Sequence, residues 1–307
     1  MTRRGDTFHD DDASLPLLGV RICISGSVPE TQYWQEPATD RSILEFVRLL
    51  SGHVLKLGGH IVHGSHPSFT PAIARQAERF QAEHPEERPL TLVVSKLWLP
   101  GKLEMEFISK YHDVAKIVVT PTVGGDNPND AQARNLSLTA LRLALVQESD
   151  VLVAVGGKLH TESGFSPGVL QELVVARWRH LPCFVIAGLG GMTRELDTQI
   201  IAQLCEENRL DANVRQKLAD SRDIVGTVGT IVEHLVHSRE VFALPHTRVA
   251  LFGRFNAASA TRDLVVDQSD SRLSEIVRAS ADRFKELLDA VNESNLDRFT
   301  ELLNAPG

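Results

Sequence analysis

Glycine, lysine and glutamate residues follow a buried apolar run in the middle of the chain, in a spacing that could bind a phosphate. Residues 151–155 are typical of a strand covered on both faces, and Gly156 and Gly157 follow directly. Residues without a Cβ let the backbone approach a phosphate, and a helix beginning near Gly168 would direct unpaired N–H groups at the same point. Lys158 could add a positive charge. The competing interpretation is a turn that uses glycine only to redirect the chain, with Lys158 in solvent.

Glu172 and Arg142 are the candidate catalytic residues near this loop. A carboxylate at position 172 could contact ribose hydroxyls and stabilise an oxocarbenium-like charge while water cleaves an N-glycosidic bond. Its alternative role is structural, because a carboxylate near a helix start interacts favourably with the helix dipole. Arg142 could clamp a phosphate through its guanidinium or pair with a surface carboxylate. Glu162, inside the loop, could share the work of Glu172.

Small residues also follow a strand predicted at residues 20–24. Ligands of open parallel sheets bind beyond the carboxyl ends of the strands, so Ser25, Gly26 and Ser27 are candidate ligand contacts. The alternative is an ordinary turn before Pro29.

A third loop follows a short strand predicted at residues 61–62, and it contains the candidate contacts Gly64, Ser65 and His66. Histidine recurs every third residue in this region. On a strand, residues i and i+3 point to opposite faces, so three such rings do not converge on a metal. The sequence therefore predicts no metal site and no cofactor.

Apolar runs alternate with helical patterns along the chain, which predicts an α/β fold: a Rossmann-like open parallel sheet flanked by helices, with a C-terminal helical extension. Further strands are predicted at residues 90–94, 115–120 and 182–188. Helices are predicted at residues 40–57, 71–80, 131–147, 193–207, 224–236 and 271–303, the last with a break near Asn295, and residues 98–112 are expected to be partly helical.

The predicted organisation is a disordered tail at residues 1–17, a Rossmann-like domain at residues 18–240 and a mainly helical extension at residues 241–307, with a short strand at residues 249–252. The extension carries an apolar stripe at helical spacing. That stripe could pack on the sheet domain, form a dimer or hold a partner protein.

Composition limits the classes of function. The 307 residues are 42% hydrophobic, enough for a substantial core, and the formal net charge of −8 argues against nucleic acid as a partner. No apolar run reaches the length of about 18 residues that a membrane span needs, and the first residues lack the apolar segment of a signal peptide. The three cysteines have no CxxC spacing, which is typical of a reducing compartment. We therefore expect a cytoplasmic protein without a membrane partner.

Two segments carry a resemblance to a known family. The pattern Gly156-Gly157-Lys158, Pro167-Gly168, Glu172 resembles the SLOG superfamily, which includes the Smf/DprA DNA-uptake proteins, the Lonely-guy phosphoribohydrolases and sensor domains of anti-phage systems and melastatin-type channels. Residues 57–71, LGGHIVHGSHPSFTP, resemble the second strand of that family and its GGHP-like loop, with serine at position 65 in place of the second glycine. The resemblance covers roughly residues 18–190.

The resemblance implies a Rossmann-like domain that binds a nucleotide or a nucleotide-derived metabolite, in signalling or antiviral defence. As partners we expect a second copy of the chain, in a homo-oligomer, and an effector protein. Lonely-guy enzymes carry PGGxGTxxE and an arginine on the preceding helix; here Val169 stands in place of the threonine, and Arg142 lies about one position out of register.

These departures favour a ligand sensor, with a nucleotide N-glycosidase or phosphoribohydrolase as the first alternative and a structural or partner-binding protein as the second. The predicted ligand-binding residues are Ser25, Gly26, Ser27, Gly64, Ser65, His66, Gly156, Gly157, Lys158, Pro167, Gly168, Val169 and Glu172.

Overall fold

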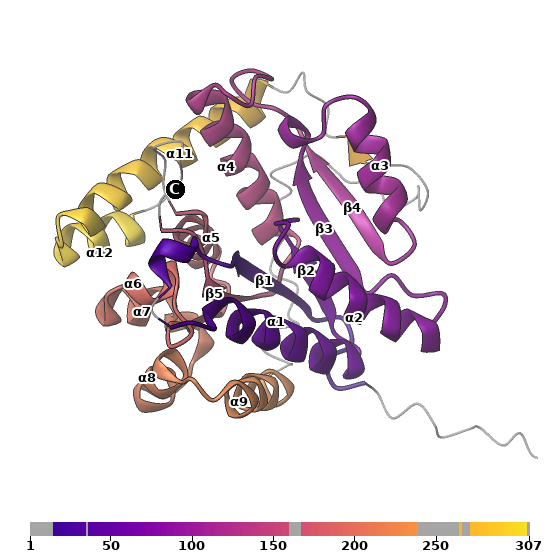
Figure 1. Cartoon of the computed structure of the whole chain (residues 1–307). Coiled ribbons are helices and arrows are strands. Elements are labelled where there is room, and N and C mark those ends of the chain that lie inside the picture. Colours follow the sequence, from indigo (N-terminus) through magenta and orange to yellow (C-terminus); the bar gives the residue numbers. More distant parts are fainter. Residues whose placement is uncertain (1–14, 35, 160–166, 239–263, 266–270, 306–307) are drawn as a thin grey trace, which may run out of the picture.

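The computed structural model describes residues 15–34, 36–159, 167–238, 264–265 and 271–305. Its centre is a parallel sheet of seven strands in the order β6-β5-β1-β2-β3-β4-β7 (Figure 1). The strands are β1 (Arg21–Ser27), β2 (His60–His63), β3 (Leu90–Ser95), β4 (Ala115–Thr120), β5 (Val151–Gly156), β6 (Cys183–Ile186) and β7 (Leu264–Val265). The predicted fold class is confirmed, because every neighbouring pair of strands is parallel and helices follow the strands along the chain.

Helices cover both faces of the sheet, as the apolar composition of strands β3 and β5 requires. One buried apolar cluster joins the sheet to α1 (Thr39–Lys56), α2 (Thr70–Glu83) and α9 (Ile224–His237). The cluster on the opposite face contains residues of α4 (Ala131–Gln147) and α5 (Gly168–Trp178). The remaining helices are η1 (Thr31–Tyr33), η2 (Lys96–Trp98), α3 (Lys102–Tyr111), α6 (Met192–Glu195), α7 (Thr198–Leu204), η3 (Glu206–Asn208), α8 (Ala212–Asp220), α11 (Ser271–Asn292) and α12 (Leu296–Asn304).

The first strand differs from its prediction in a way that matters for the site. Ser25, Gly26 and Ser27 were expected in a turn, but β1 continues through all three. They pair in register with the last three residues of β5, Ala154, Val155 and Gly156. A glycine between two serines gives a weak strand signal, and only the pairing with β5 fixes this segment as extended.

The segment after β6 also departs from the sequence pattern. One helix was predicted at residues 193–207, yet the chain forms α6, α7 and η3. Leu196 adopts an extended conformation, and the Asp197 carboxylate then accepts a hydrogen bond from Gln199 N at 2.7 Å, which starts a new helix. At the start of α1, Ala38 holds the cap position without a side-chain bond. Residues 1–14 of the predicted tail and the strand predicted at residues 249–252 lie outside the described residues.

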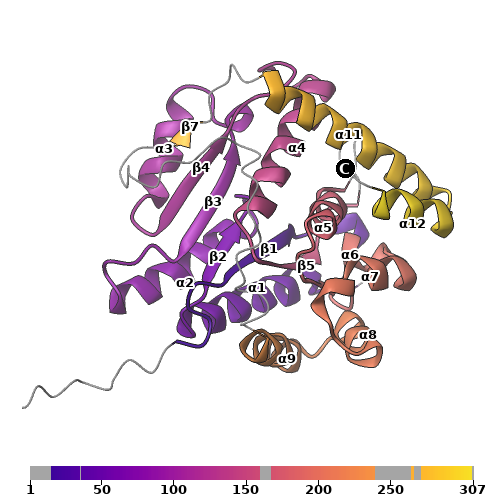
Figure 2. The ribbon, with the colours of Figure 1, turned by 180° about the vertical axis from the view of Figure 1, so that it is seen from behind.

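A C-terminal hairpin of α11 and α12 packs on the sheet domain, on the side of α4 and α5 (Figure 2). Its apolar stripe is continuous with the core cluster on that face. The break between the two helices falls at Asn295, as predicted, and its side-chain oxygen accepts a hydrogen bond from Arg298 N. Buried residues of the stripe are Leu273, Val277, Ala281, Phe284, Leu287, Ala290, Phe299 and Leu303.

An ion pair links the start of β1 to the start of β5. Arg21 donates from its backbone N and from Nε to Asp150 Oδ2, at 2.9 and 3.1 Å, and from Nη2 to Oδ1 at 3.0 Å. The two residues are 129 positions apart in sequence. Together with the strand pairing, this contact places β1 in the interior of the sheet, between β5 and β2.

None of the described helices combines the length and apolar character that a membrane crossing requires.

Replacing Gly26 with alanine should strongly destabilise the fold. Gly26 has φ of +141°, and a Cβ there would lie 1.9 Å from the carbonyl oxygen of Val155, which pairing with β1 holds in place. We expect a loss of more than about 2 kcal/mol of unfolding free energy. Gly229→Ala in α9 is the matched control, because no atom lies within 4 Å of its Cβ position, and it should stabilise by up to about 1 kcal/mol. Urea denaturation of both variants measures the difference; equal midpoints would contradict the close approach of β1 and β5.

Candidate functional site

The ends of β1 and β5 are in direct backbone contact at the carboxyl edge of the sheet. Gly157 N donates to Ser27 O at 2.8 Å, which continues the strand pairing into the loop. Gly156 and Gly157 adopt positive φ values of +66° and +93°. A Cβ on Gly156 would lie 2.5 Å from Ser27 O, so both the conformation and the spacing require glycine.

The loop after β6 closes on the same glycines. Thr193 Oγ1 accepts from Gly156 N at 3.2 Å, and Met192 N donates to Gly157 O at 3.0 Å. A Cβ on Gly191 would lie 2.6 Å from the carbonyl carbon of Gly156. Both glycine N–H groups are therefore bonded inside the protein. The glycines shape the floor of the site, and free donors for a phosphate must come from elsewhere.

The N-terminus of α5 supplies such donors. The helix begins at Gly168, and Pro167 at the cap position makes no side-chain hydrogen bond to the first turn. The N–H groups of the first turn of a helix have no partner within the helix, and they carry the positive end of its dipole. This end of α5 lies over the glycine floor, because a Cβ on Gly157 would lie 2.5 Å from Val169 Cγ2.

The Arg142 guanidinium lies at the same helix end. A Cβ on Gly168 would lie 2.9 Å from Arg142 Nη2, so the absence of a side chain at position 168 makes room for the arginine. Arg142 is 7% exposed, and burial lowers its pKa, with a partial offset from the Glu172 carboxylate. The alternative of a surface ion pair is therefore wrong for Arg142. A buried cation beside the positive end of a helix favours an anion at this point.

Gln171 holds Arg142 in place, and the sequence interpretation overlooked it. Arg142 Nη1 donates to Gln171 Oε1, and Gln171 Nε2 donates to Thr139 Oγ1 at 3.0 Å. Gln171 is only 1% exposed. The signal available in the sequence was a lone amide in the apolar run of α5.

Glu172 faces the end of β1 from the first turns of α5. Ser25 Oγ donates to its Oε2 at 2.5 Å, which joins two of the predicted site residues. Burial raises the pKa of Glu172, and both the Arg142 charge and the Ser25 hydrogen bond oppose that rise. The carboxyl group therefore keeps its proton to a higher pH than an exposed glutamate does.

The loop after β2 forms the neighbouring wall of the site. Ser65 adopts a left-handed conformation with φ of +56°, and its buried Oγ has no hydrogen-bond partner among the described residues. His66 Nδ1 contacts Ser68 Oγ at 2.8 Å, and Ser68 Oγ accepts from Val28 N at 3.2 Å, which ties the loop to the end of β1. Gly64 packs toward α4: a Cβ there would lie 3.6 Å from side-chain atoms of Leu141 and Leu145.

Lys158 is exposed, and its charge acts on His66. Burial lowers the pKa of His66 to about 4, with smaller contributions from His63 and Lys158. The lysine therefore lies near enough to this loop to bring a positive charge to the rim of the site.

The three regularly spaced histidines have separate partners. His60 Nε2 contacts Thr91 Oγ1 at 2.8 Å, and His63 Nδ1 contacts Ile24 O at 2.9 Å. Across the described parts of the chain, no three His, Cys, Asp or Glu side chains are arranged to hold a metal ion.

The structure thus brings together predicted residues from β1, the β2 loop, the end of β5 and α5 at one edge of the sheet. Arg142 joins them from α4. Residues 160–166, with the candidate Glu162, lie outside the described residues.

Comparison with known families agrees with this arrangement. The family model of SLOG cluster 2 matches residues 16–234, more than two thirds of the 307-residue chain. The chain belongs to the SLOG family. The match includes every candidate site residue of this SLOG domain, and the α11–α12 hairpin lies outside it. A search among curated proteins found no significant match.

The position of His66 in the SLOG domain predicts a pH dependence of stability. The folded protein keeps this ring neutral down to about pH 4, whereas the unfolded chain takes up a proton below about pH 6.5. The unfolded state binds more protons in this window, so the free energy of unfolding falls as the pH drops from about 6.5 to about 4.

The variant His66→Gln removes the contribution of this histidine to the pH dependence of the unfolding free energy. Between pH 7 and pH 5 the variant should lose about 1–2 kcal/mol less unfolding free energy than the parent protein, as measured by urea denaturation. His53→Gln on α1, where the histidine is exposed, is the matched control and should follow the parent. An unchanged pH dependence in His66→Gln would contradict the burial of this ring.

Proposed function

We propose that this SLOG domain binds a nucleotide or a nucleotide-derived metabolite, and that it acts as a ligand sensor. The observation that carries the proposal is the buried Arg142 guanidinium at the uncapped N-terminus of α5, beside Gly168. Two sources of positive potential meet there in an environment of low dielectric. A phosphate would accept hydrogen bonds from the first turn of α5 and from the arginine, and it would relieve the repulsion between them.

The surrounding groups suit the remainder of such a ligand. The glycine floor at positions 156 and 157 permits close approach, and Lys158 places a further charge at the rim. Ser65 Oγ offers a hydrogen-bonding group that no described residue satisfies. In this proposal Glu172 and Ser25, which are hydrogen-bonded to each other, would contact ribose hydroxyls, because a carboxylate accepts hydrogen bonds from neighbouring hydroxyl groups.

Family membership supports the same class of ligand, and it is the basis for the wider role that we propose. The resemblance to Smf/DprA proteins, Lonely-guy enzymes and anti-phage sensor domains favours signalling or antiviral defence in the cytoplasm. In this role the protein would form a homo-oligomer and pass the signal to an effector protein. Neither a cofactor nor nucleic acid is part of this proposal.

The second candidate function is hydrolysis of a nucleotide N-glycosidic bond. The position of Glu172 favours it, because this side chain accepts a hydrogen bond from Ser25 at 2.5 Å and interacts with the Arg142 charge at the proposed phosphate site. In that reaction the bond between ribose C1′ and the base nitrogen breaks, water supplies a hydroxyl group to C1′, and the base leaves with a proton. The Glu172 carboxylate would stabilise the oxocarbenium-like charge, and Arg142 would hold the phosphate.

Two substitutions separate the candidates. Arg142→Gln should weaken binding of AMP and ADP-ribose at least about tenfold under either function, because it removes a charged donor to the phosphate. Glu172→Gln should leave a sensor's affinity within about threefold, yet abolish release of free adenine by an enzyme. Calorimetry measures binding, and mass spectrometry of the same samples measures adenine. Arg41→Gln, an exposed arginine on α1, is the matched control. Equal affinity of Arg142→Gln and the parent for both ligands would contradict the assignment of the phosphate site.

Gly168→Ala tests the helix end directly. The new Cβ would lie 2.9 Å from Arg142 Nη2, and the flexible arginine side chain would have to move from the start of α5. We expect phosphate affinity to fall by about tenfold while the free energy of unfolding changes by less than about 1 kcal/mol. Gly229→Ala, the same change in α9, should leave affinity unchanged. Parent-like affinity in Gly168→Ala would show that the guanidinium does not take part in binding.

A further inference from the structure

A cavity lies between the SLOG domain and the C-terminal hairpin, at the end of α5 opposite the proposed phosphate site. Its volume is about 570 Å³, within the range of small-molecule sites. From the N-terminus of α5 to this end the helix rises roughly 16 Å, so the cavity is separate from the proposed phosphate site. It is lined by Arg177, Trp178, His180, Ala279, Ser280, Arg283, Leu303, Asn304 and Ala305.

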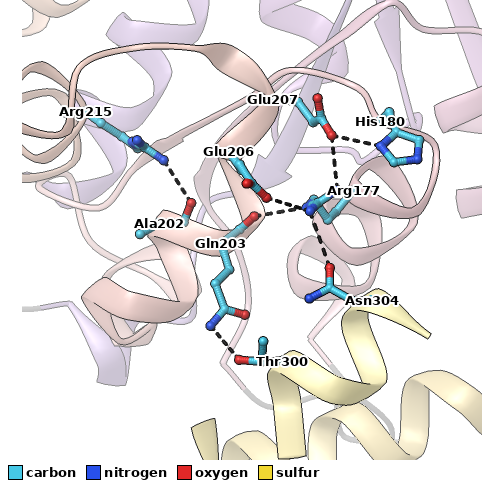
Figure 3. A network of polar contacts seen from close by, with 9 residues as sticks. All are labelled: Arg177, His180, Ala202, Gln203, Glu206, Glu207, Arg215, Thr300 and Asn304. Carbon is cyan, nitrogen blue, oxygen red and sulfur yellow. Dashed lines mark hydrogen bonds and ion pairs between the residues drawn. The ribbon is translucent and has the colours of Figure 1, made fainter. Parts of the chain in front are cut away.

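Among the described residues, the lining is rich in hydrogen-bond donors and contains no carboxylate. Of its two arginines, Arg177 already has hydrogen-bond partners within the protein. It donates from Nη2 to Glu206 at 2.6 Å and from Nη1 to Glu207 at 3.2 Å, and Nη2 also reaches Asn304 at 3.5 Å (Figure 3). This network joins α5 to η3 and α12 and forms a fixed wall.

Arg283 is different, because described residues hold its position and leave part of its donor set without a partner among them. The guanidinium carbon lies 4.4 Å from the ring centroid of Trp178, and Nη2 donates to the carbonyl oxygens of Leu302, at 3.1 Å, and Ala305. Nε and Nη1 make no hydrogen bond to a described residue. Partial burial lowers the pKa of Arg283, and the Glu286 charge offsets part of that effect.

We propose that this cavity between α5 and the C-terminal hairpin is a binding site for a small organic anion. Arg283 would bind the carboxylate or phosphate group of that anion. A guanidinium that is stacked on an aromatic ring and anchored at one nitrogen loses little freedom when it binds a planar or tetrahedral anion. Ser280 and Asn304 add polar groups beside it, and Ala279 and Leu303 offer apolar surface to the body of the ligand. An occupant would bridge α5, α11 and α12, and so link the hairpin to the helix that begins at the phosphate site.

Benzoate and phenyl phosphate are suitable probes, because they share an apolar ring and differ in the anionic group. The chain has three tryptophans, and the indole NMR signal of Trp178, assigned with Trp178→Phe, reports on the cavity. We expect at least one anion to shift this signal in a saturable way at millimolar concentration, with the signals of Trp34 and Trp98 unchanged. Whichever of the two anions binds more tightly identifies the anionic group that the cavity prefers. Neutral benzyl alcohol should produce no saturable shift of the Trp178 signal.

Arg283→Gln should weaken the binding at least about tenfold. Arg278→Gln, an exposed arginine on the same helix and outside the cavity, is the matched control and should bind as the parent does. Ala279→Phe fills the cavity while keeping the charge, and it should also block binding. Thermal unfolding checks the fold of each variant. If Arg283→Gln does not fold, the loss or retention of anion binding in Ala279→Phe tests the proposal instead. No saturable shift with either anion, an equal shift with benzyl alcohol, or parent-like binding in the folded variants would overturn the proposal.

Discussion

Backbone contact between the ends of β1 and β5 is the constraint on which the rest of the site depends. Gly26 and Gly156 allow two neighbouring strands and the loop after β6 to approach without intervening side chains. The first turn of α5 packs on this contact. Val169 rests against Gly157, and Glu172 then faces Ser25 one turn later. The chemistry at this edge of the sheet is therefore a consequence of close backbone packing beneath it.

The second feature is the buried charge of Arg142, whose position does not favour the stability of the folded protein. Burying the Arg142 guanidinium costs solvation energy, and the neighbouring start of α5 adds to the cost because both are positive. Gln171 and Thr139 compensate by hydrogen bonding, and Glu172 compensates through its charge. Such an arrangement stores a preference for an anion in the folded state. It has the form expected of a binding site, where local instability is balanced by a ligand.

Much of the fold followed from the sequence because parallel strands that are buried on both faces are continuous apolar runs. Residues 115–120 and 131–147 were predicted with the bounds that β4 and α4 have in the structure. Prediction failed where long-range pairing overrides local pattern, as in the last residues of β1, or where an extended residue interrupts a helical run, as at Leu196. For the candidate site, glycine spacing predicted that Gly156 and Gly157 follow a strand at the carboxyl edge of the sheet, where the structure has them. It could not show that the amides of Gly156 and Gly157 are already bonded, or that Gln171 fixes Arg142, because both depend on partners distant in sequence.

The interior position of β1, between β2 and β5, has a consequence for how the chain assembles during translation. β1 precedes the other described strands, yet one of its two neighbours, β5, is held to it by an ion pair that spans 129 positions. At ribosomal speeds of about 5–20 residues per second, β1 waits on the order of ten seconds for that neighbour to emerge. During this interval one flank of β1 presents unpaired N–H and C=O groups, which are open to pairing with other chains. The nascent domain would therefore benefit from chaperone protection until β5 docks, and only then do Ser25 and Glu172 first meet.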